Sequence, residues 1–294
     1  MSHADTIRDS ASPLDPIPTG ETPRLEALSG LKGVVFDIYG TLIISAAGDI
    51  SLAGAEHKDE AIRQAVEAET GTPLSPEIDS LTDAYHRHVK AQQQARRDAG
   101  IEYPEVEIRE VWRDLLAEWD HPAAPDAEAC ERIAVAYEVA VNPVWPMPGL
   151  AETLGAIRDA GLALGIVSNA QFYTLHLFPA FLEGRTLPDL GFDHDLQVYS
   201  FRMREGKPSR HLYEVLAEKL AGKGLTPQEI LYVGNDMRND IWPAREVGFR
   251  TAFFAGDQRS LRWRKDDPRV EGVVPDLVLT DLRQLLEVVE KPTA

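Results

Sequence analysis

The stretch Val34–Leu42, V-V-F-D-I-Y-G-T-L, decides how the rest of the chain is interpreted. It opens with a short apolar run of the kind that forms a buried strand, and Gly40 permits a tight turn soon after that run. The run ends at Asp37, so a carboxylate lies at the tip of a buried strand, and Thr41 offers a hydroxyl to the same place. Taken alone, the segment could also hold an Asp that only caps a turn.

Downstream of residue 149, helical periodicity alternates with short apolar runs. The expected strands are Leu162–Val167, Leu196–Tyr199, Ile230–Val233, Thr251–Phe254 and Leu277–Leu279. The expected helices are Leu150–Ala160, Ser209–Ala221 and Asp281–Val289, with two more starting at Phe172 and Asp240. This alternation predicts an α/β fold with a doubly wound parallel sheet. Ligands of such sheets bind beyond the carboxyl ends of the strands, and the polar motifs described below follow predicted strands.

Between residues 56 and 141 the sequence shows helical periodicity and no convincing strand. The expected helices are His57–Glu69, Pro76–Ala99, Glu105–Trp119 and Ala127–Ala140. A proline-rich return linker at 142–149 closes this block, and a small hairpin with its turn at Gly48–Asp49 is expected before it. The predicted organisation is an α/β core over 25–50 and 146–294 with an all-helical cap inserted over 51–145. Residues 1–24 are predicted to be a mobile, disordered tail, because prolines and small polar residues dominate them.

The composition limits the classes of partner. Thirty basic against 48 acidic residues give a net charge of -18, which excludes nucleic acid and anionic membranes as expected partners. The basic stretch Arg259–Lys265 is therefore interpreted as a surface loop. Cys130 is the single cysteine, no long apolar run exists and no signal peptide is evident, so a cytoplasmic location is expected. Nothing in the sequence indicates an oligomeric state.

Four segments carry a resemblance to a known family. Phe36–Leu42 resembles the first motif of the haloacid dehalogenase-like superfamily, Asp-x-Asp/Tyr-Gly-Thr. The other three motifs follow in the family's order at Val167–Asn169, Gly206–Ser209 and Val233–Ile241, and the helical insert resembles the family's cap. The resemblance implies a Rossmann-like core and a hydrolase in which Asp37 is a covalent nucleophile.

The resemblance also implies a role for the other polar residues of these motifs. Lys207 would neutralise the charge of the nucleophile and of a small anionic substrate, and Asp240 would take part in catalysis by activating water. The implied substrate-binding side chains are Tyr39, Thr41, Ser168 and Asn169. The implied metal ligands are Asp37, Asn235, Asp236 and Asp240. A carboxylate that attacks a phosphoryl group needs a cation beside it, and oxygen ligands suit Mg²⁺.

Two positions depart from the family's phosphatases. Tyr39 stands where those enzymes have an Asp that protonates the leaving alkoxide, and a phenol with a pKa near 10 is a poor general base. The pattern Asp-x-Tyr-Gly-Thr instead resembles 2-haloacid dehalogenases, whose halide leaves without a proton. Asn235 stands where the family usually has the first acid of the fourth motif, which should weaken metal binding unless Asp236 turns inward.

Three hypotheses remain open. The favoured one is hydrolysis of a small phosphate ester through an aspartyl-phosphate at Asp37, with Mg²⁺. The second is a 2-haloacid dehalogenase, which needs no Mg²⁺ but needs a cap cation, for which the candidates are Arg63, Arg87, Arg96 and Arg97. The third is a catalytically weak or inactive protein that binds a phosphorylated ligand. In each case the cap is expected to open and close over Asp37.

Overall fold

The computed structural model describes residues 2–46 and 55–289. Its main sheet has six strands: β1 (Gly33–Phe36), β4 (Ala163–Ser168), β5 (Phe192–Tyr199), β6 (Ile230–Gly234), β7 (Arg250–Phe254) and β8 (Leu277–Leu279). The spatial order is β5-β4-β1-β6-β7-β8, and every neighbouring pair is parallel. The predicted doubly wound parallel sheet is confirmed.

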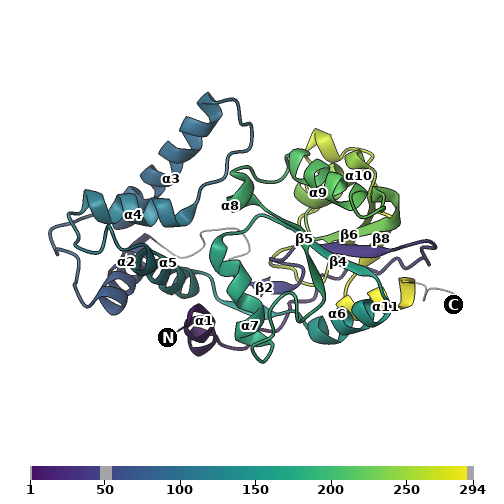
Figure 1. Ribbon diagram of the computed structural model, residues 1–294, viewed down its shortest axis with the longest axis horizontal. Helices are drawn as coiled ribbons and strands as arrows, with labels where there is room; N and C mark the ends of the chain where they lie inside the picture. The colour runs from purple at the N-terminus through teal and green to yellow at the C-terminus, as the bar shows by residue number, and fades with distance from the viewer. Residues whose placement is uncertain (1, 47–54, 290–294) are drawn as a thin grey trace.

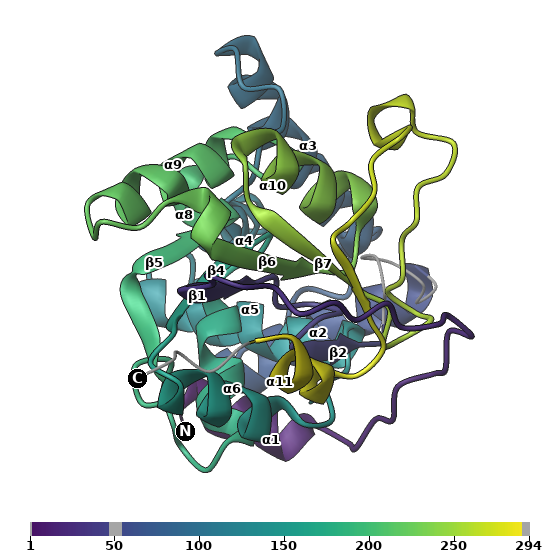
Figure 2. The same ribbon diagram turned by 90° about the vertical axis from the view of Figure 1, so that its right-hand side faces the viewer.

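Helices cover both faces of this sheet, as Figure 2 shows. One face carries α6 (Leu150–Asp159) and α11 (Leu285–Val288); the other carries α9 (His211–Ala221) and α10 (Trp242–Val247). The side chains of β1 alternate accordingly: Val34 and Phe36 belong to the cluster with α6 and α11, whereas Val35 packs with α9 and α10. A parallel sheet buried on both faces explains why its strands are continuously apolar.

The direction of strand addition reverses beside β1. From β1 the chain adds β4 and β5 on one side, then returns to add β6, β7 and β8 on the other. In open α/β sheets a crevice for ligands forms at such a reversal, beyond the carboxyl ends of the strands. Asp37 immediately follows β1 and therefore lies at this crevice.

The helical insert lies to one side of the sheet in Figure 1. Its helices are α2 (Ala55–Thr70), α3 (Leu81–Asp98), α4 (Ile108–Glu118) and α5 (Ala127–Val141), and no strand occurs among the described residues from 55 to 141. Helix α3 begins later than predicted because Ser80 adopts a left-handed conformation (φ 55°), which interrupts a right-handed helix. The fold thus has a helical cap beside an α/β core, while the exact domain bounds at 51 and 145 stay a prediction.

The proline-rich return linker contains a strand that the sequence did not predict. β3 (Val144–Pro146) pairs antiparallel with β2 (Ile43–Ser45), so the chain leaves and re-enters the core through one two-stranded ribbon. The predicted hairpin turn at Gly48–Asp49 lies outside the described residues, and the strand that pairs with β2 is β3.

Several connections are short helical turns. α7 (Leu177–Phe181) and α11 follow 3₁₀ turns at Phe172–His176 and Leu282–Gln284, and α10 follows a π-helical turn at Met237–Ile241. Helix α9 starts at His211, two residues after the predicted start, because the hydroxyl oxygen of Ser209 accepts the His211 N–H and makes a turn there. The remaining elements are α8 (Ser200–Met203) and 3₁₀ turns at Pro227–Glu229 and Pro268–Val270.

In the part of the chain that is described, no helix has the length and apolar character needed to cross a bilayer.

The prediction of a disordered tail over residues 1–24 is wrong. Residues His3–Ser10 form helix α1, whose start is closed by a capping box between Ser2 and Asp5. Ile7 is 2% exposed and meets Val135 of α5 and Leu177 of α7 at the wall of one small cavity. One buried apolar side chain and a capped first turn therefore anchor this helix between cap and core.

Hydrogen bonds of backbone and side chains hold the segment after α1 against the core, and a few leucines pack beside them. The Ile17 N–H donates to Asp257 Oδ1 (3.1 Å), the Thr19 hydroxyl donates to the Ala255 carbonyl (2.8 Å), and Arg24 bridges Val278 of β8. Composition misled the prediction here, because an extended segment can be fixed along an existing sheet edge with few apolar residues of its own.

Ile7→Ala should lower the free energy of unfolding by about 2–5 kcal/mol, because it removes a fully buried side chain and leaves a cavity. Urea denaturation followed by circular dichroism measures the change. Ile17→Ala is the matched control, since Ile17 is 47% exposed and should shift the midpoint little. Equal midpoints for wild type and Ile7→Ala would mean that α1 contributes nothing to the fold.

Candidate active site

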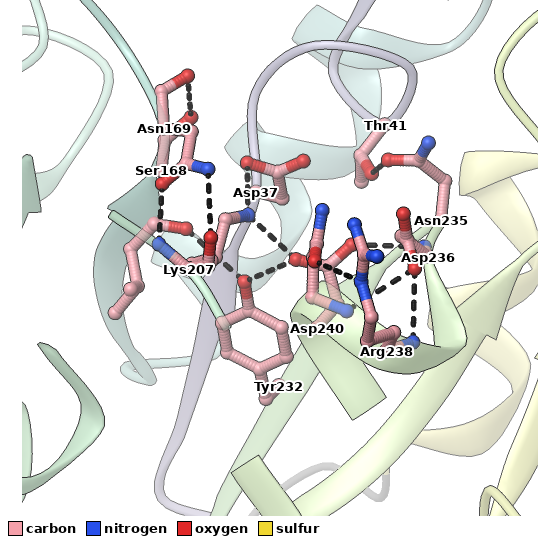
Figure 3. A network of polar contacts seen from close by, with 12 residues as sticks. Asp37, Thr41, Ser168, Asn169, Lys207, Tyr232, Asn235, Asp236, Arg238 and Asp240 are labelled. Atoms are coloured by element: carbon pink, nitrogen blue, oxygen red, sulfur yellow. Dashed lines mark hydrogen bonds and ion pairs between the residues drawn. The ribbon is translucent and has the colours of Figure 1, made fainter. Parts of the chain in front are cut away.

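Polar side chains from three strand ends and one loop meet at the edge of the sheet (Figure 3). Asp37 follows β1, Ser168 ends β4, and Asp240 lies in the π-helical turn after β6. Lys207 comes from the loop between α8 and α9. The Asp37 N–H donates to the Val233 carbonyl (2.9 Å), which continues the β1–β6 ladder and fixes the carboxylate at the strand tip.

Lys207 joins two carboxylates. Its Nζ lies 2.8 Å from Asp37 Oδ1 and 2.6 Å from Asp240 Oδ1, and its side chain is only 3% exposed. Burial alone would lower the pKa of Lys207, but the charges of Asp240 and Asp37 outweigh burial and raise that pKa above its usual value. The ammonium therefore stays charged beside the predicted nucleophile.

Asp240 is fixed by three donors. Oδ1 accepts from Lys207 Nζ and from the Tyr232 hydroxyl (3.0 Å), and Oδ2 accepts from the Asp236 N–H (2.9 Å). Burial raises the pKa of Asp240 to about 7 against the opposing effect of Lys207. Sequence reasoning missed Tyr232, because a tyrosine inside an apolar strand gives no sign of a polar partner.

Asn169 holds the backbone of the lysine loop. Its Oδ1 accepts the Lys207 N–H (2.7 Å), and its Nδ2 donates to the Lys207 carbonyl (3.3 Å). Both ends of the amide are thus used within the protein. The buried Ser168 hydroxyl makes one long hydrogen bond, to the Asn169 carbonyl (3.4 Å). Substrate binding by these two side chains stays a prediction, and the geometry favours Ser168 over Asn169 for it.

The Tyr39 hydroxyl is bonded to Thr174 Oγ1 (2.9 Å). The side chain lines a cavity of about 10 Å³ together with Ile7, Glu138 and Tyr173. Burial, with a smaller contribution from Glu138, raises the pKa of Tyr39 far above its usual value, so the phenol stays protonated. A protonated phenol is poorly suited to act as a base, and its hydroxyl is engaged with Thr174. Substrate binding by Tyr39 stays a prediction.

Tyr39→Phe should change kcat less than about threefold, because the hydroxyl serves a hydrogen bond that contributes only about 1 kcal/mol to stability. Steady-state kinetics on a substrate found in a panel, with Tm measured alongside, provide the check. A drop of several orders of magnitude at unchanged Tm would show that the phenol takes part in the chemistry after all.

The basic stretch after β7 is more than a surface loop. Ser260 is buried, its carbonyl accepts from Asn235 Nδ2 (2.6 Å), and its Cβ would lie 2.5 Å from a Cβ added to Gly40. Gly40 has φ +80°, so both its backbone angle and this close approach require glycine. Thr41 Oγ1 donates to Asn235 Oδ1 (3.1 Å), which links the first motif to the fourth.

Asp236 faces an arginine of the same loop. Arg264 Nη2 lies 2.7 Å and Arg264 Nε lies 3.1 Å from Asp236 Oδ2. Asp236 Oδ1 accepts the N–H groups of Arg238 (2.9 Å) and Asn239 (3.1 Å). This Asp, which would have to turn toward Asp37 to strengthen a metal site, is instead paired with Arg264.

The predicted metal ligands do not fit a Mg²⁺ ion as they stand. Carboxylate and amide oxygens suit this ion chemically. Yet the oxygens of Asn235, Asp236 and Asp240 all accept hydrogen bonds from the protein. Among residues 2–46 and 55–289, no three His, Cys, Asp or Glu side chains are grouped so as to hold a metal ion.

The cap rests on the core through polar contacts. Arg204 makes two hydrogen bonds to the Glu110 carboxylate (3.0 and 2.6 Å), and the Gln171 side chain bonds the backbone at Val106 and Ile108 (both 3.0 Å).

The four cap arginines that were candidates for binding a substrate anion either make contacts within the cap or are exposed to solvent. Arg63 donates to the Ser75 and Ile78 carbonyls, and Arg87 pairs with Glu118, so both serve contacts within the insert. Arg97 is exposed and Arg96 partly so. None of the contacts found for these four links them to Asp37.

Comparisons with known proteins bear on the family of this chain. Residues 31–248 match the model of the haloacid dehalogenase-like hydrolase family. The chain is 26% identical to the glyceraldehyde 3-phosphate phosphatase of Methanopyrus kandleri over 89% of this chain and 98% of that one. It is 28% identical to the phosphoglycolate phosphatase of Salmonella paratyphi A over 76% and 81%.

Solved structures share the fold. The 2-haloacid dehalogenase from Pseudomonas syringae pv. Tomato DC3000 superposes with a TM-score of 0.54 at 22% identity, over 88% of this chain and 97% of that one. At that identity the likeness concerns the fold alone.

Proposed function

Since this chain belongs to the haloacid dehalogenase-like hydrolases, we propose that it hydrolyses a small phosphate ester through a covalent aspartyl-phosphate at Asp37. The observation that carries the proposal is the contact of Lys207 Nζ with Asp37 Oδ1 at 2.8 Å. Asp37 Oδ2 receives no hydrogen bond from the described residues, so one oxygen is held by a cation and the other is available to attack. The phosphatases among the relatives support phosphorus as the electrophile.

The reaction has two displacement steps. Asp37 Oδ2 attacks phosphorus, the bond from phosphorus to the ester oxygen breaks, and the alcohol leaves with a proton taken from water. Water then attacks phosphorus, Asp240 accepts its proton, and the bond from phosphorus to Asp37 breaks to release phosphate. Lys207 stays charged throughout and offsets the negative charge that the two carboxylates present to the phosphoryl group.

The experiment is a panel of small phosphate esters assayed for phosphate release, with Asp37→Asn as the blank. Phosphatases of this family generally use Mg²⁺, so each assay is run with Mg²⁺ and with EDTA. The proposal expects at least one ester to turn over in the wild type and none in the variant. If all esters stay intact while 2-haloacids release halide, phosphorus is not the electrophile. Ligand-induced stabilisation without any turnover would support the non-catalytic hypothesis.

Tyr39 favours a second candidate, a 2-haloacid dehalogenase. The phosphatases' proton donor is missing at that position, and a halide needs no proton on leaving. A single turnover in oxygen-18 water separates the two reactions. A carbon ester at Asp37 is hydrolysed at the carbonyl of the Asp37 side chain, so the label enters the protein. An aspartyl-phosphate is hydrolysed at phosphorus, so the label enters the phosphate.

A further inference from the structure

We propose that Arg264 is a positioning residue that replaces a divalent cation at Asp236, so that the site works without a metal ion. Turnover without a metal ion rests on the hydrolysis proposed at Asp37, whereas the exclusion of a cation from Asp236 does not. Among the described residues, no other arginine side chain contacts the Asp236 carboxylate.

The Asp236 carboxylate is fully used. Each oxygen accepts at least two hydrogen bonds, Oδ2 from the Arg264 guanidinium and Oδ1 from the Arg238 and Asn239 N–H groups. A carboxylate offers about four acceptor positions, and these donors occupy them. Asp236 is 6% exposed, and a carboxylate buried to this degree needs a cationic partner, which Arg264 supplies. A metal ion could bind there only by displacing the guanidinium.

The backbone holds Arg264 in place for this contact. The Met237 N–H donates to the Arg262 carbonyl (2.9 Å), and the Arg262 N–H donates to the Asn235 carbonyl (3.0 Å), so the loop lies along the fourth motif as a short bridge. Arg264 has φ +52°, a left-handed conformation that is unfavourable for a residue with a Cβ. Such a conformation persists where the surroundings fix it, here with the guanidinium directed at Asp236.

The side chains of two other predicted metal ligands, Asn235 and Asp240, also accept hydrogen bonds within the protein. Asn235 Nδ2 faces the Ser260 carbonyl, which fixes the amide orientation, and its Oδ1 accepts from Thr41. Asp240 accepts from Lys207, Tyr232 and a backbone N–H. Asp37 Oδ2 alone of the ligand oxygens lacks a donor among the described residues. Mg²⁺ demands near-octahedral oxygen geometry, and one carboxylate oxygen does not provide it.

The charges lead to the same conclusion. Asp37, Asp236 and Asp240 bring three carboxyl groups together, and Lys207 and Arg264 place two positive charges in direct contact with them. The two cations of the chain therefore supply the neutralisation for which a metal would otherwise be needed.

The test measures cation binding and turnover separately. Thermal unfolding of wild type, Arg264→Gln and Arg264→Lys is recorded over a Mg²⁺ titration without substrate, and turnover of the panel's best substrate is measured with Mg²⁺ or EDTA. We expect a wild-type Tm independent of Mg²⁺ and activity that changes less than about twofold with EDTA. Arg264→Gln should show a Tm that rises with Mg²⁺ concentration and activity that requires Mg²⁺, while Arg264→Lys keeps the wild-type behaviour.

Arg269→Gln is the matched control, because Arg269 makes a similar two-contact pair with Asp267 on the same loop and should not create a Mg²⁺ response. Two results with the wild type alone would overturn the proposal: a Tm that rises with Mg²⁺ concentration, or activity that is lost in EDTA. Absence of any Mg²⁺ response in Arg264→Gln overturns the counter-ion role. If no phosphate ester is hydrolysed, the thermal measurements still report whether Mg²⁺ binds, because they contain no substrate.

Discussion

Asp37→Asn should lose turnover on every substrate, by a factor on the order of 10⁴ or more. The amide has nearly the volume of the carboxylate but no nucleophilic oxygen, and Lys207 keeps Asp240 as an ion-pair partner. The fold should therefore survive while the chemistry stops. Product release in a discontinuous assay and Tm by thermal unfolding measure the two effects.

Asp159→Asn is the control for this variant, because Asp159 is exposed and, among residues 2–46 and 55–289, pairs only with its neighbour Arg158. It should retain wild-type kinetics. Full activity in Asp37→Asn at normal Tm would mean that another group attacks the substrate, and the covalent mechanism at Asp37 would have to be abandoned.

Lys207→Gln should lose both activity and stability. Without the ammonium, the carboxylates of Asp37 and Asp240 face each other in a buried site, and removing one partner of a buried ion pair costs about 3–5 kcal/mol. Urea denaturation should show this decrease in unfolding free energy, and kinetics should show turnover reduced at least as severely as in the nucleophile variant.

Lys223→Gln provides the comparison, since Lys223 pairs with Asp193 and Asp195 at the surface. Surface pairs contribute about 0–1 kcal/mol, so this variant should unfold almost as the wild type does. If Lys207→Gln were equally mild, the buried contacts of Lys207 would not be what holds the site together.

The core and most of the site could be predicted because both follow from local signals. Short apolar runs fix the parallel strands, and the carboxyl ends of parallel strands share one edge, so polar residues that follow different strands must meet. Asp37, Lys207 and Asp240 lie together for this reason, and the fold that the motifs implied is the fold observed.

The contacts that change the chemistry could not be predicted, because they depend on loops distant in sequence. Asp236 contacts Arg264 only because the loop after β7 returns to the fourth motif. Tyr39, which follows β1, contacts Thr174 in the 3₁₀ turn that follows β4. The helix α1 differs from these cases. Its start signal, Ser2 with Asp5, is local in the sequence, but the prediction for residues 1–24 was made from composition alone and did not use it.

The most direct test of a covalent ester at Asp37 is to quench the enzyme with acid during steady-state turnover and to analyse its peptides by mass spectrometry. We predict that the peptide containing Asp37 gains the mass of the transferred group, that the gain disappears once substrate is consumed, and that Asp37→Asn never shows it. An unmodified Asp37 peptide at every quench time, with product still accumulating, would contradict the account.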